Sequence, residues 1–323
     1  MGAVELSIVA PPPKMNIEEL RGLKIGNTEI IDTFAEAFGM KFTRLIVTAY
    51  DDYWLDAALR EFTGYSSSVI ACDLEIGCEQ FLTPDETPDG RIGASVLAFG
   101  FSSDALAKHI PNRTGQCLMT CPSTAVFDGL PGAEATVAVG KHIRFFGDGF
   151  QKSKVVAGRR YWRIPVMDGE FLVEDKAGIG SGVAGGNIIV QADSQDAALA
   201  SVRRATEAMS KVAGVITPFP GGVARSGSKV GSRYKALRAS TSDPYCPTLK
   251  GRVDSKLLDG VNSVLEIVID GVDEESVANA MLAGLNAAAG DGVTAIGAGN
   301  YGGKLGKFHF HLHQLLSGNS KNA

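Results

Sequence analysis

One carboxyl group interrupts an apolar run near the C-terminus. Residues 264–269 are VLEIVI, and Glu266 is the one charged side chain among them. Because side chains alternate along a strand, Glu266 would share a face with Val264 and Val268. A carboxyl held among apolar neighbours ionises less readily, so its pKa rises and it can donate a proton near neutral pH. The alternative is an edge or solvent-facing strand on which Glu266 pairs with a lysine or arginine, and periodicity alone does not decide.

Three loops next to predicted strands are rich in glycine. They are GIGSGVAGG (178–186), PGGVARSGSKVGS (220–232) and GAGNYGGKLG (297–306). Glycine permits positive φ and close backbone approach, so we expect ordered turns beside a ligand cleft. The substrate-binding candidates in the last two loops are Gly221, Gly222, Lys229, Asn300, Gly302, Gly303 and Lys304.

Basic residues gather in the same part of the chain. The cluster comprises Arg225, Lys229, Arg233, Lys235 and Arg238, with Lys304 and Lys307 at the corresponding place downstream. Such charges could hold the carboxylate tail of a long substrate. A solvated basic surface explains them equally well.

Several motif matches fail on their context. The GxGxxG spacings at 180–185 and 297–302 precede predicted strands, whereas dinucleotide binding needs a helix directly after the glycines. Residues 298–305 imitate a phosphate-binding loop, but Leu305 stands where a magnesium-ligating hydroxyl is required. We therefore predict no nucleotide site.

Alternate histidines near the C-terminus suggest a metal site at first sight. In FHFHLH (308–313), a strand would place His309, His311 and His313 on one face, and histidines can bind zinc. A terminal strand with an apolar inner face gives the same pattern, and no Cys, Asp or Glu lies nearby to complete a site. We predict no metal.

The elements that must position these residues repeat. Residues 187–222 and 265–303 each indicate strand, helix, strand and a closing Gly-Gly. The N-terminal half repeats this more faintly, with strands at 44–49, 67–73, 94–99 and 115–122 and helices at 51–64 and 102–110. Pairs of such units predict an α+β fold of two ferredoxin-like α/β sandwich lobes related by internal duplication.

A hairpin around Asp168-Gly169, within 158–175, places the lobe boundary near residue 167. We expect an N-terminal lobe at 25–167 and a C-terminal lobe at 168–315. Residues 1–24 would form a mobile extension and 316–323 a tail.

Bulk properties exclude several classes. The 323 residues carry a net charge of −5, which gives no attraction to nucleic acid or an anionic membrane, and no apolar run could span a bilayer. The N-terminus lacks the pattern of a signal peptide, and the five cysteines show no CxxC spacing. A cytoplasmic protein with reduced thiols is expected.

At these same residues the sequence resembles the formylmethanofuran:tetrahydromethanopterin formyltransferase family, from about residue 25 to 315. The matching stretches are IIDTFAEAF (30–38), TPDETPDGR (83–91), FFGDG (145–149), GEFLVED (169–175), GVAGGN (182–187), PFPGG (218–222), SKVGS (228–232), 244–248, LEIVIDG (265–271) and AGNYGGKLG (298–306).

The resemblance implies two ferredoxin-like lobes, a homotetramer and no prosthetic group. Its coenzyme substrates would be methanofuran and tetrahydromethanopterin, which exchange a formyl group between amine and N5 in a ternary complex. The family's key glutamate carries over to Glu266, with the implied role of a protonated acid that hydrogen-bonds the oxyanion of the tetrahedral intermediate.

The low charge of the chain is similar to that of bacterial, methylotroph-type members. That likeness implies a role in formaldehyde oxidation to formate and membership of a complex with a metallohydrolase. Two alternatives stay open: a non-catalytic docking subunit of such a complex, and an RNA-binding ferredoxin-like module. The second lacks aromatic pairs on its sheet strands and a basic balance.

Overall fold

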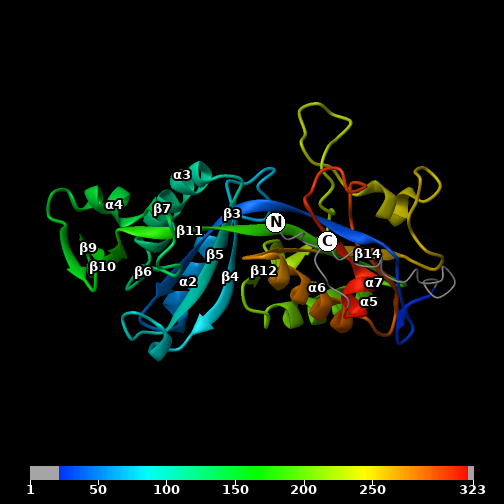
Figure 1. The fold of residues 1–323 in the computed structure, drawn as a ribbon, viewed down its shortest axis with the longest axis horizontal. Coiled ribbons are helices and arrows are strands. Elements are labelled where there is room, and N and C mark those ends of the chain that lie inside the picture. Colours follow the sequence, from blue (N-terminus) through cyan, green and yellow to red (C-terminus); the bar gives the residue numbers. More distant parts are fainter. Residues whose placement is uncertain (1–21, 319–323) are drawn as a thin grey trace, which may run out of the picture.

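The computed structural model describes residues 22–318. Two long strands, β3 (Phe34–Thr48) and β11 (Lys176–Ala192), run through both halves of the elongated molecule (Figure 1). They cross antiparallel, with residues 38–42 of β3 paired to 180–184 of β11. This pairing joins the strands of both lobes into one 16-stranded sheet.

The N-terminal lobe has the strand order β4-β5-β3-β6, with every neighbouring pair antiparallel. Its helix α2 begins after Asp51, whose side chain accepts the N–H of Trp54, and its buried residues fall three and four apart. In chain order, the elements after β3 are α2 (Asp52–Thr63), β4 (Glu75–Leu82), β5 (Gly93–Gly100), α3 (Ser103–Arg113) and β6 (Ala125–Asp128).

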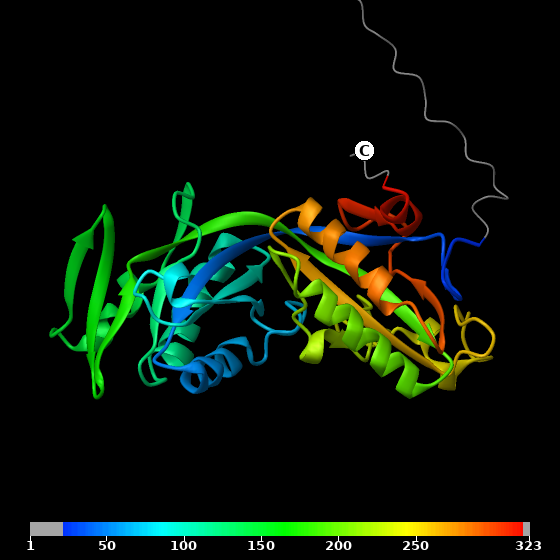
Figure 2. The ribbon, with the colours of Figure 1, turned by 90° about the horizontal axis from the view of Figure 1, so that it is seen from below.

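The C-terminal lobe repeats this arrangement in the order β12-β14-β11-β15, again antiparallel throughout. Figure 2 shows its two helices, α5 and α6, side by side along one face of the sheet. In chain order, the elements after β11 are α5 (Gln195–Met209), β12 (Val215–Ile216), β14 (Ser263–Gly271), α6 (Glu274–Ala288) and β15 (Val293–Gly297). The predicted α+β fold of two ferredoxin-like lobes is confirmed.

Each lobe has its own apolar core, and the two cores draw on interleaved stretches of chain. The C-terminal core includes Ile30, Ala35 and Ala37, whereas the N-terminal core includes Phe171 and Val173. A third, smaller cluster lies where β3 and β11 cross. The boundary near residue 167 therefore stays a prediction about sequence units.

The remaining elements lie at the edges and ends of the sheet. The predicted hairpin at Asp168-Gly169 is confirmed, because β9 and β10 pair with Val166 opposite Gly169. The elements are β1 (Lys24–Ile25), β2 (Thr28–Ile30), β7 (Ala135–Ala138), α4 (Gly140–Ile143), β8 (Lys152–Val156), β9 (Arg159–Val166), β10 (Gly169–Glu174), β13 (Val223–Ala224), β16 (Phe308–His311) and α7 (Leu312–Leu316). Most of the predicted extension, and residues 319–323 of the predicted tail, lie outside the described residues.

Two predicted strands are wrong. Residues 67–73 form a turn in which Ser68 O accepts the N–H groups of Ala71 and Cys72, and the strand begins only at Glu75. Residues 115–122 start in a helical turn that continues α3, and the strand begins at Ala125. A short apolar run gives the same signal for a buried helical turn as for a strand.

Candidate active site

Glu266 lies in the middle of β14, between Ile189 of β11 and Ala224 of β13. The alternate residues Leu265 and Ile267 join the core under α5 and α6. Glu266 therefore points to the opposite face of the sheet. That face is covered by the long connection between β12 and β14, residues 217–262, and the Glu266 residue is only 6% exposed.

Two hydrogen bonds from Ser228 hold the Glu266 carboxyl. The backbone N–H of Ser228 donates to Oε2 at 2.6 Å, and its hydroxyl donates to Oε1 at 2.7 Å. Within residues 22–318, no ion pair joins Glu266 to a basic side chain. Burial raises the pKa of Glu266, and the two bonds from Ser228 oppose this only in part. The structure thus selects the buried acid over the salt-bridged alternative.

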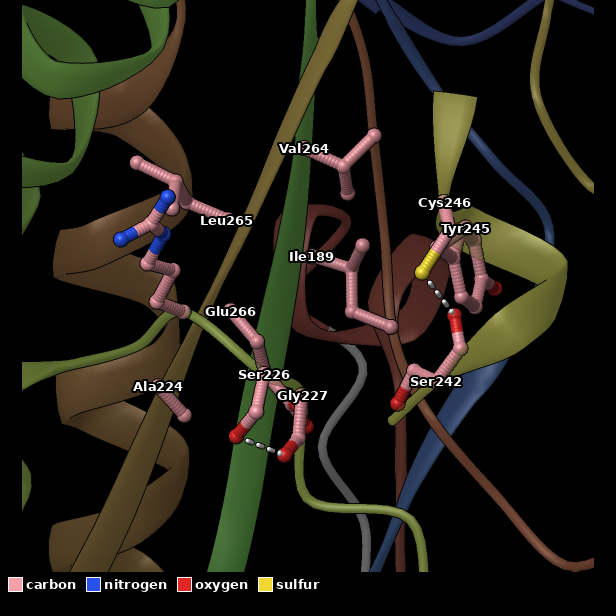
Figure 3. A pocket seen from close by; sticks show the side chains of 11 residues that line it. Ile189, Ala224, Ser226, Gly227, Ser242, Tyr245, Cys246, Val264, Leu265 and Glu266 are labelled. Carbon is pink, nitrogen blue, oxygen red and sulfur yellow. Dashed lines mark hydrogen bonds between the residues drawn. The ribbon is translucent and has the colours of Figure 1, made fainter. Parts of the chain in front are cut away.

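A narrow cavity of about 30 Å³ adjoins Glu266, enough for a water molecule or two (Figure 3). The turn that carries Ser242, Tyr245 and Cys246 lies across the cavity from Glu266. Burial, and then the negative charge of an ionised Glu266, raise the pKa of Tyr245. The lining residues are Ile189, Ala224, Arg225, Ser226, Gly227, Ser242, Tyr245, Cys246, Val264, Leu265 and Glu266.

The covering loop fits tightly over the acid. Gly227 has a φ of +71°, and a Cβ there would lie 2.1 Å from Ser242 Oγ and 3.4 Å from Glu266 Oε2. Only glycine suits this position. Lys229 forms an ion pair with Asp243, which ties the two arms of the loop together. The structure therefore places the charge of Lys229 within the loop, against a carboxylate of its own chain.

Asn300, Gly302, Gly303 and Lys304 lie in a second loop, residues 299–306, that reaches the first. The Asn300 side chain donates to Thr33 Oγ1 and Phe34 O and accepts the N–H of Gly302. Gly302 and Gly303 have φ values of +72° and +70°, and Lys304 is exposed. None of the four lines the cavity beside Glu266.

Most of the other predicted candidates lie farther out, although Arg225 also lines the cavity. Gly221 and Gly222 form a tight turn just before β13, with φ values of +62° and +80°. They shape the entry of the strand that pairs with β14, rather than the cavity wall. Of the basic cluster, the Arg225, Arg233, Lys235 and Arg238 side chains are exposed on the covering loop.

Sequence reasoning missed three groups around this acid. Glu36 on β3 is 1% exposed and accepts four backbone N–H groups of the 301–306 loop. Burial opposes its ionisation, but the four donors outweigh burial and lower its pKa to about 2. Ser228 and Tyr301 were also missed. Only Glu36 carried a signal, since it too is a carboxyl in a run of Ala and Phe, FAEAF.

The histidines do not share a strand face as predicted. β16 ends at His311, and His313 lies in α7, buried, with Nε2 2.7 Å from Ile30 O. His309 and His311 both pack on the Phe34 ring. In the part of the chain that the structure describes, no three His, Cys, Asp or Glu side chains cluster as metal ligands. In the same part, no helix is long and apolar enough to cross a membrane.

The fold and site together define a two-lobed α+β protein in which a buried carboxyl with a raised pKa faces a small cavity. Family models match both lobes. The model described as formylmethanofuran-tetrahydromethanopterin formyltransferase covers residues 23–166, and that described as its proximal lobe covers 169–315. The chain belongs to this formyltransferase family, as its resemblance predicted.

Relatives and solved structures agree with this assignment. The formyltransferase of Methylobacillus flagellatus is 53% identical over 91% of this chain and 99% of its own. That of Methanosarcina mazei is 46% identical over 91% and 100%. Two solved structures are similar over 91% of the chain: the Methanosarcina barkeri formyltransferase (45% identity, TM-score 0.86, all of that chain) and a chain of the Methylorubrum extorquens formyltransferase/hydrolase complex with methylofuran (46%, 0.87, 98%).

Proposed function

We propose that this chain transfers a formyl group between N5 of tetrahydromethanopterin and the amine of methanofuran, in one-carbon metabolism. Its relatives are named for that activity, and the similarity covers nearly their whole length. The observation that carries the proposal for this chain is Glu266, which is buried, has no basic partner among residues 22–318, and is held by Ser228 at the edge of a cavity.

In the proposed reaction the acceptor amine attacks the formyl carbonyl, whose π electrons move to oxygen. The tetrahedral intermediate then expels the donor nitrogen, which takes up a proton, while the attacking amine loses one. Glu266 stays protonated and donates a hydrogen bond to the oxyanion. A preorganised donor of this kind contributes about 3–4 kcal/mol to lowering the barrier. Holding both coenzymes together supplies the remaining acceleration as proximity.

The contacts of Glu266 suggest where its proton resides. A backbone N–H can only donate, so Oε2, which accepts from Ser228 N, is suited to be the carbonyl oxygen of the neutral acid. The proton then belongs on Oε1. The Ser228 hydroxyl, 2.7 Å from Oε1, can turn to accept it until a substrate oxygen replaces that hydroxyl.

Replacing Glu266 tests the proposal. Formyl exchange between the two coenzymes is measured with the purified chain. Glu266→Ala should lower kcat about 10²–10³-fold with coenzyme binding retained, because the oxyanion loses its donor. Glu266→Gln keeps a hydrogen-bond donor, so its kcat should lie between those of wild type and Glu266→Ala. An alanine variant with nearly full rate would contradict the role, and a wild-type chain that binds neither coenzyme would favour the non-catalytic docking alternative.

We further propose a homo-oligomer, with the tetramer as the expected form, that can join a metallohydrolase-containing complex. The structurally similar formyltransferase/hydrolase complex supports the second part. The exposed basic side chains Arg225, Arg233, Lys235 and Arg238 and the glycine loops around Gly221, Gly303 and Lys304 are proposed to contact the coenzymes. We propose no prosthetic group, with the two coenzymes as substrates only.

A further inference from the structure

A second buried carboxylate lies outside the cavity and takes no part in the proposed chemistry. Glu36 belongs to β3, whereas Glu266 belongs to β14, and the two strands are not neighbours in the sheet. Glu36 Oε2 accepts the N–H groups of Tyr301 and Gly303 at 2.7 and 2.9 Å. Its Oε1 accepts those of Leu305 and Gly306, both at 2.6 Å. The carboxylate thus organises one loop completely.

That loop reaches the loop that holds Glu266 through a single hydroxyl. Tyr301 donates from its hydroxyl to Ser228 O at 3.2 Å and accepts the N–H of Val230 at 3.1 Å. The same Ser228 that accepts from Tyr301 donates both hydrogen bonds to Glu266. An unbroken series of contacts therefore leads from Glu36 through Tyr301 and Ser228 to the acid.

We propose that Glu36 and Tyr301 are positioning residues for Glu266. Glu36 holds the 301–306 loop in place through its four hydrogen bonds. The Tyr301 hydroxyl in turn fixes the backbone at Ser228, and Ser228 orients the Glu266 carboxyl. The inference rests on the proposed function and adds residues that never touch the coenzymes' reacting atoms.

The charge on Glu36 is essential to this arrangement. Four N–H donors need two oxygen atoms, each accepting two bonds. A glutamine offers one oxygen, and its NH₂ group would face two N–H donors of the loop. Even an isosteric replacement therefore loosens the loop from its anchor.

The Tyr301 ring can stay in place when its hydroxyl is removed. The ring lies 6.4 Å from the ring of Phe38, centroid to centroid, and phenylalanine would keep that packing. Only the bonds to Ser228 O and Val230 N would be lost. Tyr301→Phe is therefore the sharper variant, and it keeps the inference testable if Glu36→Gln folds poorly.

The test is the pH dependence of formyl transfer in these variants. We expect Tyr301→Phe to lower kcat about 10-fold, because the hydrogen bond from Glu266 to the oxyanion would be poorly directed. KM should change less than about 2-fold. Its alkaline limb should move to higher pH, because Ser228 would favour ionised Glu266 less. Glu36→Gln should move kcat and this limb in the same directions. In a Ser228→Ala background, Tyr301→Phe should have a smaller effect than it has alone, because only the backbone N–H bond to Glu266 is left to disturb.

Glu79→Gln is the matched control. Glu79 is also a buried glutamate, bound to Arg44, Ser95 and the N–H of Gly214, but it lies in the N-terminal lobe. It should lower Tm without moving the alkaline limb. The inference is overturned if Tyr301→Phe keeps the wild-type kcat and pH profile. It is also overturned if Tyr301→Phe lowers kcat only in proportion to its loss of Tm, without moving the alkaline limb, as expected for Glu79→Gln. A wild-type chain without transfer would instead overturn the proposed function.

Discussion

The pKa values of two buried glutamates in this chain shift in opposite directions because the two carboxyls accept different numbers of hydrogen bonds. Glu36 accepts four backbone N–H groups, and its pKa falls to about 2. Glu266 accepts one N–H and one hydroxyl, and burial raises its pKa. Both residues lie in apolar runs, so burial alone does not set the direction of the pKa shift. The donors that decide it come from loops remote in sequence.

Ser228→Ala tests this balance at Glu266. The variant keeps the N–H donor but loses the hydroxyl, which favours the ionised form, so the pKa of Glu266 should rise further. If protonated Glu266 is the active form, transfer is lost as the pH rises through its pKa. The alkaline limb of kcat should therefore move to higher pH in this variant.

The control for Ser228→Ala is Ser232→Ala, in the same loop. The Ser232 hydroxyl accepts the N–H of Tyr234 and makes no contact with Glu266. Its alkaline limb should stay where the wild-type limb lies. Equal shifts in both variants would show that loop disturbance, not the bond to Glu266, sets the profile.

At the scale of elements, the apolar pattern predicted what is local. Asp51, Ser194 and Asp273 each accept an N–H at the start of a helix, and all three helices were expected. Glu266 was detectable because it interrupts the apolar run VLEIVI. Ser228 and Tyr301 were not, since their roles depend on loops that meet only in the folded chain.

The two glycines of the Pro220–Gly222 turn differ in how much a side chain would cost in stability. Both Gly221 and Gly222 have positive φ, which costs another residue about 1–2 kcal/mol. A Cβ on Gly222 would also lie 2.6 Å from Thr206 Cγ2, whereas one on Gly221 meets nothing within 4 Å. Gly222→Ala should therefore lower the free energy of unfolding by about 1 kcal/mol or more beyond Gly221→Ala. Denaturant unfolding measures this difference, and equal losses would contradict it.

At the scale of the whole molecule, the two lobes are joined by more than the β3–β11 crossing. Asp270 of β14 is fully buried, and its Oδ1 accepts the N–H of Gly185. Burial, and then its neighbour Glu75 on β4, raise the pKa of Asp270 well above the ordinary value. The two carboxyls cannot both ionise cheaply, so folding favours a protonated form of the pair.

The raised pKa of Asp270 makes stability depend on pH. A pKa raised by folding contributes stability that is full below the unfolded pKa and is lost as the pH rises through the folded pKa. Asp270→Asn replaces this carboxyl by an amide that does not titrate. Its thermal stability should therefore fall less than that of wild type as the pH rises above about 4. The control is Asp259→Asn, whose carboxyl is fully exposed. Parallel Tm curves for Asp270→Asn and wild type would contradict the account.

The central claim is that Glu266 acts as a neutral acid, and the pH dependence of single-turnover formyl transfer tests it most directly. Wild type and Glu266→Gln are compared with both coenzymes saturating. We predict that wild-type transfer declines on the alkaline side as Glu266 ionises. Glu266→Gln should be slower, with that decline absent, because its amide does not titrate. An identical alkaline decline in both proteins would contradict the claim.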